Sequence, residues 1–130
     1  MGEQISITMQ DGFELGAYHS TPSGQSKGVV VVIQEIFGVN GHIREVVEGY
    51  AERGYHAIAP ALFDRIEPDL QLGYTEADMG KGIELAFQGL EMAQTMKDLQ
   101  SVVDHAAAQG AVGVVGYCFG GLLTYLSACQ

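Results

Sequence analysis

Basic residues and cysteines are scarce in this sequence of 130 residues. Six lysines and arginines stand against sixteen aspartates and glutamates, which gives a net charge of -10. Because nucleic acids and anionic membrane surfaces repel an acidic protein, we expect neither as a partner. The two cysteines, both near the C-terminus, are too few for a disulfide framework, so we expect a protein of the reducing cytoplasm.

Long apolar runs are absent as well. No stretch approaches the roughly 20 apolar residues of a membrane span. The N-terminal residues MGEQISITMQDG show neither the basic nor the apolar region of a secretory signal. Nearly half of the residues (47%) are apolar, and the chain is long enough for one domain with a core. We therefore expect a single domain over residues 1–130.

The apolar residues that are present follow two patterns. Alternation on both sides of Asp11-Gly12 predicts an antiparallel hairpin. Three apolar runs are typical of strands that are covered on both faces, as in a parallel sheet. They are Val29–Ile33, His56–Pro60 and the run from Val112 to Val115.

Helices are expected between these strands. Asn40 can cap the first helix, and Gly54 ends it. A second helical region spans about 81–109 with a break near Gly89, and a third helix begins at Phe119. In the second region one face carries Met92, Met96, Leu99, Val103 and Ala106. From Leu62 to Gly80 neither pattern holds, so we expect a long loop that is either a wall of a site or a mobile surface segment.

The order of these elements predicts an α/β fold, an open and mostly parallel sheet with an antiparallel N-terminal hairpin. Ligands bind such sheets beyond the carboxyl ends of the parallel strands. Two segments leave strands at that end. They are Gln34-Glu35-Ile36-Phe37-Gly38 and Gly116-Tyr117-Cys118-Phe119-Gly120-Gly121.

The segment GYCFGG is typical of the strained turn that presents a nucleophile between a strand and a helix. Its glycines, Gly116, Gly120 and Gly121, let the helix begin almost on top of the strand. A helix N-terminus lowers the pKa of a thiol, and the thiolate of Cys118 is the form that attacks. The alternative is an inert cysteine buried in a glycine-rich turn.

Backbone donors for an oxyanion are expected in both segments. The N–H of Phe119 points to where a carbonyl oxygen would become negative, and the N–H of Ile36 can supply a second donor. Glu35 follows a buried strand, where a carboxylate is costly to bury unless it is paired or used. The alternative for Glu35 is a solvated carboxylate in a surface loop.

The stretch VVVIQEIFGVNGHIREVVEGYAERGYHAIAPALF, followed by GVVGYCFGG, resembles the dienelactone hydrolase family of α/β-hydrolases. The resemblance spans roughly residues 27–121. It implies that Cys118 is the nucleophile, that Glu35 hydrogen-bonds and helps activate the resting thiol, and that Ile36 and Phe119 share the oxyanion hole. The implied reaction is hydrolysis of a small lactone or activated ester through an acyl-cysteine, without a metal or an organic cofactor.

The family also uses an aspartate and a histidine that follow later strands of its sheet. The sequence reaches only Gln130, so we expect a partial α/β-hydrolase domain that alone is weakly active or inactive. His105 and His56 are expected at the opposite end of the sheet, about 16 Å or more from Cys118, and nothing ties His19 to the site. His42 is at the correct end, although the family does not use a histidine there as its base.

Two other functions stay open. A non-catalytic interaction module could pair the strand edge from Val112 to Val115 with a second copy or with a complementing C-terminal polypeptide. A redox pair of Cys118 and Cys129 is disfavoured, because eleven residues along a helix separate them by about 16 Å. The arginines with which the family binds anionic substrates have no assured match in this sequence. Arg44 and Arg53 lie on a helix, and Arg65, in the loop, is only a candidate.

Overall fold

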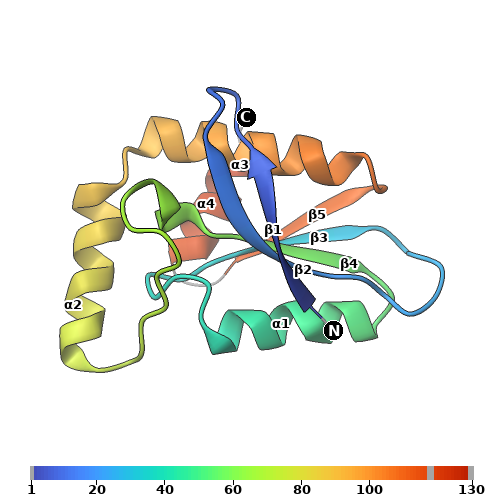
Figure 1. Ribbon diagram of the computed structural model, residues 1–130, viewed down its shortest axis with the longest axis horizontal. Coiled ribbons are helices and arrows are strands. Elements are labelled where there is room, and N and C mark those ends of the chain that lie inside the picture. The colour runs from blue at the N-terminus through green and yellow to red at the C-terminus, as the bar shows by residue number, and fades with distance from the viewer. Residues whose placement is uncertain (1, 117–118, 129–130) are drawn as a thin grey trace.

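A five-stranded mixed sheet forms the centre of the protein (Figure 1). The computed structural model describes residues 2–116 and 119–128. The strands lie in the order β1-β2-β4-β3-β5, with β3, β4 and β5 parallel and β1 and β2 antiparallel at one edge. The predicted α/β class is confirmed. The strands are β1 (Gly2–Thr8), β2 (Glu14–Ser20), β3 (Val29–Ile33), β4 (His56–Pro60) and β5 (Val112–Gly116).

The N-terminal hairpin forms where alternation predicted it. Its turn is closed by hydrogen bonds from the Met9 N–H to the Phe13 carbonyl (2.8 Å) and from the Gly12 N–H to the Met9 carbonyl (3.0 Å). Gly12 has a φ of +91°, which glycine adopts without steric cost. One face of the hairpin, including Leu15 and Ala17, is buried in the core, as the alternating pattern requires.

Helices cover both faces of the sheet. Figure 1 shows α1 on one side of the strands and α3 on the other, and α4 packs with α3 and β5. None of the helices in the described part of the chain is long and apolar enough to cross a membrane. The helical elements are α1 (Gly41–Glu52), the short 3₁₀ turn η1 (Leu62–Arg65), α2 (Glu76–Glu84), a π-helical turn (Leu85–Gly89), α3 (Met92–Ala107) and α4 (Phe119–Ala128).

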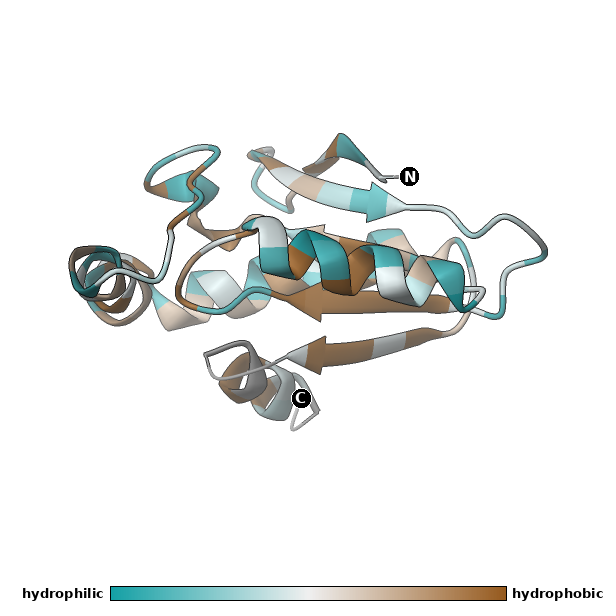
Figure 2. Ribbon diagram, turned by 90° about the horizontal axis from the view of Figure 1, so that it is seen from below, coloured by the Kyte–Doolittle hydropathy of each residue, from teal (hydrophilic) through white to brown (hydrophobic). Residues whose placement is uncertain are grey.

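The strand β3 joins the two halves of the core. All five of its residues are buried, and Figure 2 shows its apolar ribbon between the layers of helices. Because successive side chains of a strand point to opposite faces, Val30 and Val32 pack with α1 while Val31 packs with α3. A fully buried valine or isoleucine contributes about 1.5–3 kcal/mol to stability, which explains the uninterrupted apolar run.

The helix α1 begins and ends where its sequence indicated. The side chain of Asn40 accepts a hydrogen bond from the Ile43 N–H (3.3 Å), as an N-cap does. Gly54 follows the helix with a φ of +99°, a conformation suited to the residue after a helix end. Between the two, Ile43, Val47 and Ala51 form the buried face.

The expected loop from Leu62 to Gly80 is wrong in part. The structure places the turn η1 at its start, and α2 begins at Glu76 with Thr75 as its N-cap (Thr75 Oγ1 to the Asp78 N–H, 3.1 Å). Two glycines in α2 remove side chains from its faces, so the helical pattern is weak in the sequence. The break near Gly89 is confirmed, because a π-helical turn ends at Gly89 and Leu90 after it is extended.

The predicted apolar face of α3 is also corrected at two positions. Val102 is fully buried, whereas Val103 is half-buried and Met92 is 37% exposed. The buried face includes the polar side chains of Thr95 and Asp98. A search for apolar residues alone therefore places the face about one residue away from its true direction.

Candidate active site

The exits of β3 and β5 lie next to each other at the carboxyl end of the sheet. In the parallel register Ile33 pairs with Gly116, so Glu35 follows two residues after one strand and Cys118 two residues after the other. Cys118 itself lies outside the described residues. Phe119 is the first residue of α4, and the first N–H groups of a helix have no acceptor within it. Gly120 and Gly121 belong to the same first turn.

The segment from Glu35 to Gly38 is a tight turn. Glu35 is half-buried, and its carbonyl accepts a hydrogen bond from the Gly38 N–H (3.4 Å). Gly38 has a φ of +79°, and a Cβ there would lie 2.5 Å from the Leu70 carbonyl oxygen. Only glycine fits this position, which explains the last residue of the Q-E-I-F-G motif.

The two sides of the Ile36 backbone differ. Its own carbonyl oxygen packs against Gly82 of α2, where a Cβ would overlap with it. Its N–H belongs to the peptide whose carbonyl is that of Glu35, and in a trans peptide the two point in opposite directions. Among the described residues this N–H has no hydrogen-bond acceptor. It can therefore serve as a donor to a ligand.

Gln34 has a structural role that the sequence did not reveal. Its side chain is fully buried, its Nε2 donates to the Glu35 carbonyl (3.2 Å), and its Oε1 accepts from the Leu62 N–H (2.9 Å). The amide thus bridges the segments that follow β3 and β4. A polar residue at the end of an apolar strand was the available signal, because buried polar groups nearly always have hydrogen-bond partners.

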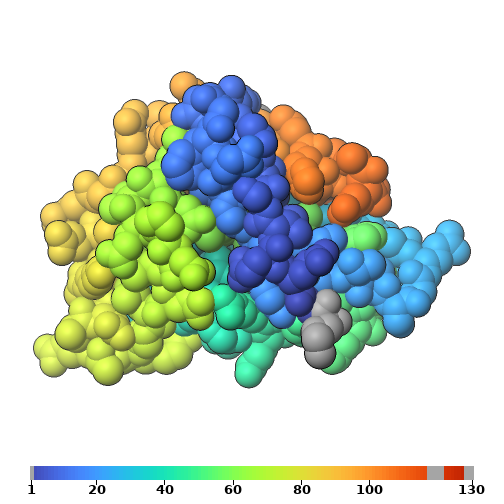
Figure 3. Space-filling view, viewed as in Figure 1, coloured from blue at the N-terminus to red at the C-terminus, as the bar shows by residue number. Residues whose placement is uncertain are grey.

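The segment from Leu70 to Tyr74 covers the turn and favours the site-wall interpretation of the long loop. The Leu72 N–H donates to the Phe37 carbonyl (2.9 Å), and Asn40 Nδ2 donates to the Leu72 carbonyl (3.3 Å). The rings of Phe37 and Tyr74 meet edge to face, with centroids 4.6 Å apart. In Figure 3 the part of the chain after η1 lies beside the N-terminal hairpin on one surface.

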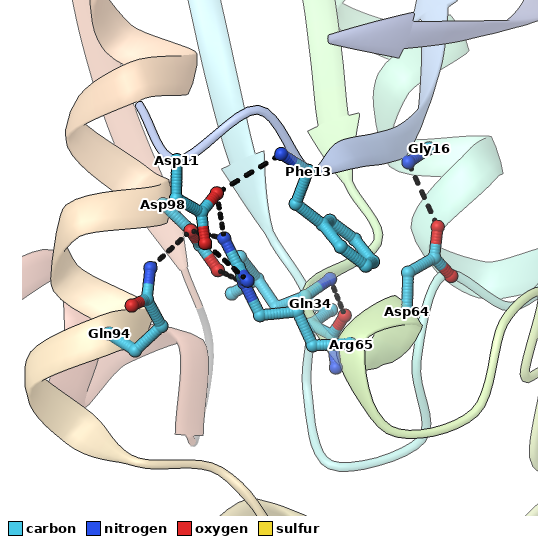
Figure 4. A network of polar contacts seen from close by, with 9 residues as sticks. Asp11, Phe13, Gly16, Gln34, Asp64, Arg65, Gln94 and Asp98 are labelled. Carbon is cyan, nitrogen blue, oxygen red and sulfur yellow. Dashed lines mark hydrogen bonds and ion pairs between the residues drawn. The ribbon is translucent and has the colours of Figure 1, made fainter. Parts of the chain in front are cut away.

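Arg65 is bound within the protein, which corrects its assignment as the candidate for an anionic substrate. Its guanidinium donates to Asp98 (Nε to Oδ2, 2.6 Å) and to Asp11 (Nη2 to Oδ1, 2.9 Å), as Figure 4 shows. It also lies 4.5 Å from the centre of the Phe13 ring. The hydrogen bond with Arg65 lowers the pKa of Asp11 to about 2, and the two carboxylates raise the pKa of Arg65. The three charges join the hairpin turn, η1 and α3.

Three histidines lie at the opposite end of the sheet. His56 begins β4, and its Nδ1 is 3.2 Å from Nε2 of His19, with the rings stacked. Burial is the main cause that lowers the pKa of His19, and the imidazoles of His56 and His105 add to it. His42 is exposed and is the second residue of α1, which begins directly after the Glu35 turn. The described histidines therefore provide only His42 at the end of the sheet that carries Glu35.

Comparison with known proteins identifies the family. The model of the dienelactone hydrolase family matches residues 15–130. The chain belongs to this family. A carboxymethylenebutenolidase of Pseudomonas putida is 36% identical over 132 residues, which cover 98% of this chain and 56% of that protein. A Klebsiella pneumoniae crystal structure assigned as a dienelactone hydrolase superimposes with a TM-score of 0.81 at 32% identity, covering 100% of this chain and 55% of the other.

The dienelactone hydrolase of Anabaena variabilis shares the fold at 15% identity, with a TM-score of 0.68, and covers 98% of this chain and 56% of its own. The chain thus spans about half the length of the relatives that it matches. The family resemblance predicted from the two motifs is confirmed. Within the described part of the chain, no group of three His, Cys, Asp or Glu residues is placed to hold a metal ion.

Proposed function

We propose that this member of the dienelactone hydrolase family contributes the nucleophile and the oxyanion hole of a cysteine hydrolase that acts on a lactone or a related activated ester. Cys118 is the nucleophile, Glu35 accepts the hydrogen bond of the resting thiol, and the N–H groups of Ile36 and Phe119 bind the oxyanion. The observation that carries the proposal is the register of β3 and β5, which brings the two motifs to neighbouring strand ends.

The proposed reaction has two steps. The thiolate of Cys118 attacks the carbonyl carbon, a C–S bond forms, and the electron pair moves to the oxygen between the two N–H donors. The ester C–O bond then breaks, and the leaving oxygen takes up, by way of solvent, the proton that the thiol released when it became the thiolate. Water afterwards hydrolyses the thioester and returns the thiol. For a lactone, the broken bond opens the ring, so the alcohol and the acyl group remain one molecule.

The histidines at the far end of the sheet do not provide the base of the second step. Since the base must lie about 2.6–3.2 Å from the proton that it takes, or reach it through one water, His19 and His56 do not qualify. We therefore propose that these 130 residues alone acylate Cys118 and clear the acyl group slowly. A cytoplasmic location remains a prediction from the small number of cysteines.

A second candidate function rests on the edge of the sheet. Among the described strands β5 pairs only with β3, and α4 beside it exposes Leu122 (41%) and Tyr125 (68%). Such an edge pairs readily with another strand, so a non-catalytic interaction module is the alternative. Acylation of Cys118 by an ester is expected of the hydrolase and not of the interaction module, so it distinguishes the two functions.

The test uses the two cysteines as an internal comparison. Because Cys118 precedes the N-terminus of α4, it should react with iodoacetamide about tenfold faster than Cys129 near neutral pH. With p-nitrophenyl acetate we expect a burst of one p-nitrophenolate per chain and an acetyl group on Cys118 by mass spectrometry. Cys129→Ser should keep the burst and Cys118→Ser should abolish it. Equal alkylation rates and no burst would contradict the proposal and favour the interaction module.

A further inference from the structure

Gln34 lies at the junction of two loops and is fully buried. Its Oε1 accepts from the Leu62 N–H (Figure 4), and its Nε2 donates to the Glu35 carbonyl. We propose that Gln34 is a positioning residue, whose amide holds the peptide between Glu35 and Ile36 in the orientation that the oxyanion hole requires. The inference rests on the proposed function and extends it to a residue that acts through a neighbour's backbone.

The planar peptide transmits this effect. The Glu35 carbonyl and the Ile36 N–H belong to one rigid unit, so rotating one rotates the other by the same angle. Gln34 Nε2 and the Gly38 N–H both donate to that carbonyl, at 3.2 and 3.4 Å. These two donors set the direction of the carbonyl and, on the opposite side, the direction of the Ile36 N–H.

The other end of the amide connects the turn to a rigid part of the fold. Gln34 Oε1 accepts from the N–H of Leu62, the first residue of η1. The same short turn holds Arg65, bound to the buried carboxylate of Asp98 on α3, and Asp64, which accepts from the Gly16 N–H of β2 (2.9 Å). The Gln34 side chain therefore connects the Ile36 peptide, through η1, to α3 and β2.

Removal of the amide should reduce only reactions that form an oxyanion. In Gln34→Met the side chain keeps nearly its length but offers neither donor nor acceptor to the two loops. Acylation by p-nitrophenyl acetate passes through a tetrahedral oxyanion, and losing one donor costs about 10²–10³ in rate, so we expect a loss of at least about tenfold. Iodoacetamide reacts by displacement at a methylene carbon and forms no such oxyanion, so its rate at Cys118 should change by less than about twofold.

The control is a variant that is destabilised elsewhere. Val102→Ala removes buried methyl groups from α3 and should lower the unfolding midpoint without changing either rate. If Gln34→Met does not fold by circular dichroism, Gln34→Leu takes its place, since leucine also lacks a donor and an acceptor and leaves no charge at this buried site. The same split between the two reagents is expected.

Several outcomes would overturn the inference. Equal losses with both reagents, unchanged acylation in a folded variant, or failure of both variants to fold would each leave Gln34 with a structural role alone. Absence of a burst in the parent chain would instead overturn the proposed function, and this inference with it. If the parent shows a burst and the rate constant of that burst is the same in Gln34→Met, the inference alone is overturned.

Discussion

Single residues of this protein show how burial changes the chemistry of a side chain. Asp98 and Gln34 are both nearly free of solvent, and each is satisfied by contacts that come from other elements. A buried polar group without such partners would cost about 1–3 kcal/mol. The residues that connect the loops near the site therefore also contribute to the stability of the fold.

Glu35 is the residue whose role is most directly testable. A carboxylate beside a thiol disfavours the thiolate, so its replacement by the neutral amide in Glu35→Gln should move the alkylation profile of Cys118 to lower pH. The rate of iodoacetamide labelling is measured across the titration, with circular dichroism to verify the fold. Glu45→Gln on the exposed side of α1 is the matched control. An unchanged profile would make Glu35 a solvated loop carboxylate.

His19 should make the stability of the fold depend on pH. Burial, His56 and His105 lower its pKa below the ordinary value of 6.5, and Glu3 opposes them. Below pH 6.5 the imidazole of His19 is protonated in the unfolded chain but stays neutral in the folded protein until the pH falls further. The free energy of unfolding therefore falls as the solution becomes more acidic.

Urea unfolding between pH 6.5 and about 5 measures this dependence. In His19→Gln the decrease should be smaller, whereas the exposed His42→Gln should retain it. A decrease of the same size in the His19 variant would show that other groups cause it.

At the scale of elements, α2 packs against the site turn. It lies at the carboxyl end of the parallel strands (Figure 1), and its backbone at Gly82 packs against the Ile36 carbonyl. Two glycines of this helix lie in contrasting surroundings. Gly82 is buried, whereas Gly80 is exposed and a Cβ there would meet nothing within 4 Å.

This contrast gives a matched pair of variants. Gly80→Ala should stabilise the protein by about 0.5–1 kcal/mol, because alanine favours a helix interior over glycine. Gly82→Ala should destabilise it by about 1–3 kcal/mol, because its methyl group would overlap with the Ile36 carbonyl. Thermal unfolding and hydrogen exchange of α2 provide the measurement. Stabilisation by both substitutions would show that α2 can move away from the turn at no cost.

At the scale of the whole molecule, the two edges of the sheet differ. The edge at β1 belongs to a hairpin, whereas β5 forms the other edge of the described sheet (Figure 2). Most residues of β5 are only half-buried. Because β5 is apolar and has unpaired backbone groups on one side, we propose that it recruits another strand. A second copy or a complementing C-terminal polypeptide would satisfy it.

These 130 residues, produced alone, should therefore self-associate through β5. A lysine on an edge strand opposes pairing, and Gly113→Lys places one where a Cβ has open space. The control, Gly24→Lys, adds the same charge in a loop with equal space. Sedimentation velocity should show less association for the strand variant only. A parent chain that stays monomeric, or equal effects of both lysines, would contradict this use of the edge.

The sequence by itself determined the elements whose signals are local. Alternation around Asp11-Gly12 was sufficient for the hairpin, the valine run for β3, and Asn40 and Gly54 for the ends of α1. The pair of motifs was sufficient for the family. In each case the physical cause, a side-chain period or the conformation of one residue, lies within a few positions along the chain.

Only the tertiary structure decided which side chains meet. Gln34 accepts a hydrogen bond from the N–H of Leu62, 28 residues further along the chain, and Arg65 lies 33 residues from its partner Asp98. Gln34 belongs to a motif that does not reveal its partner, and Arg65, in the expected loop, was only a candidate for binding an anionic substrate. The partner of a buried polar group depends on how helices and strands pack, and no local period records it. The orientation of the Ile36 peptide, on which the proposed chemistry depends, is a property of that packing.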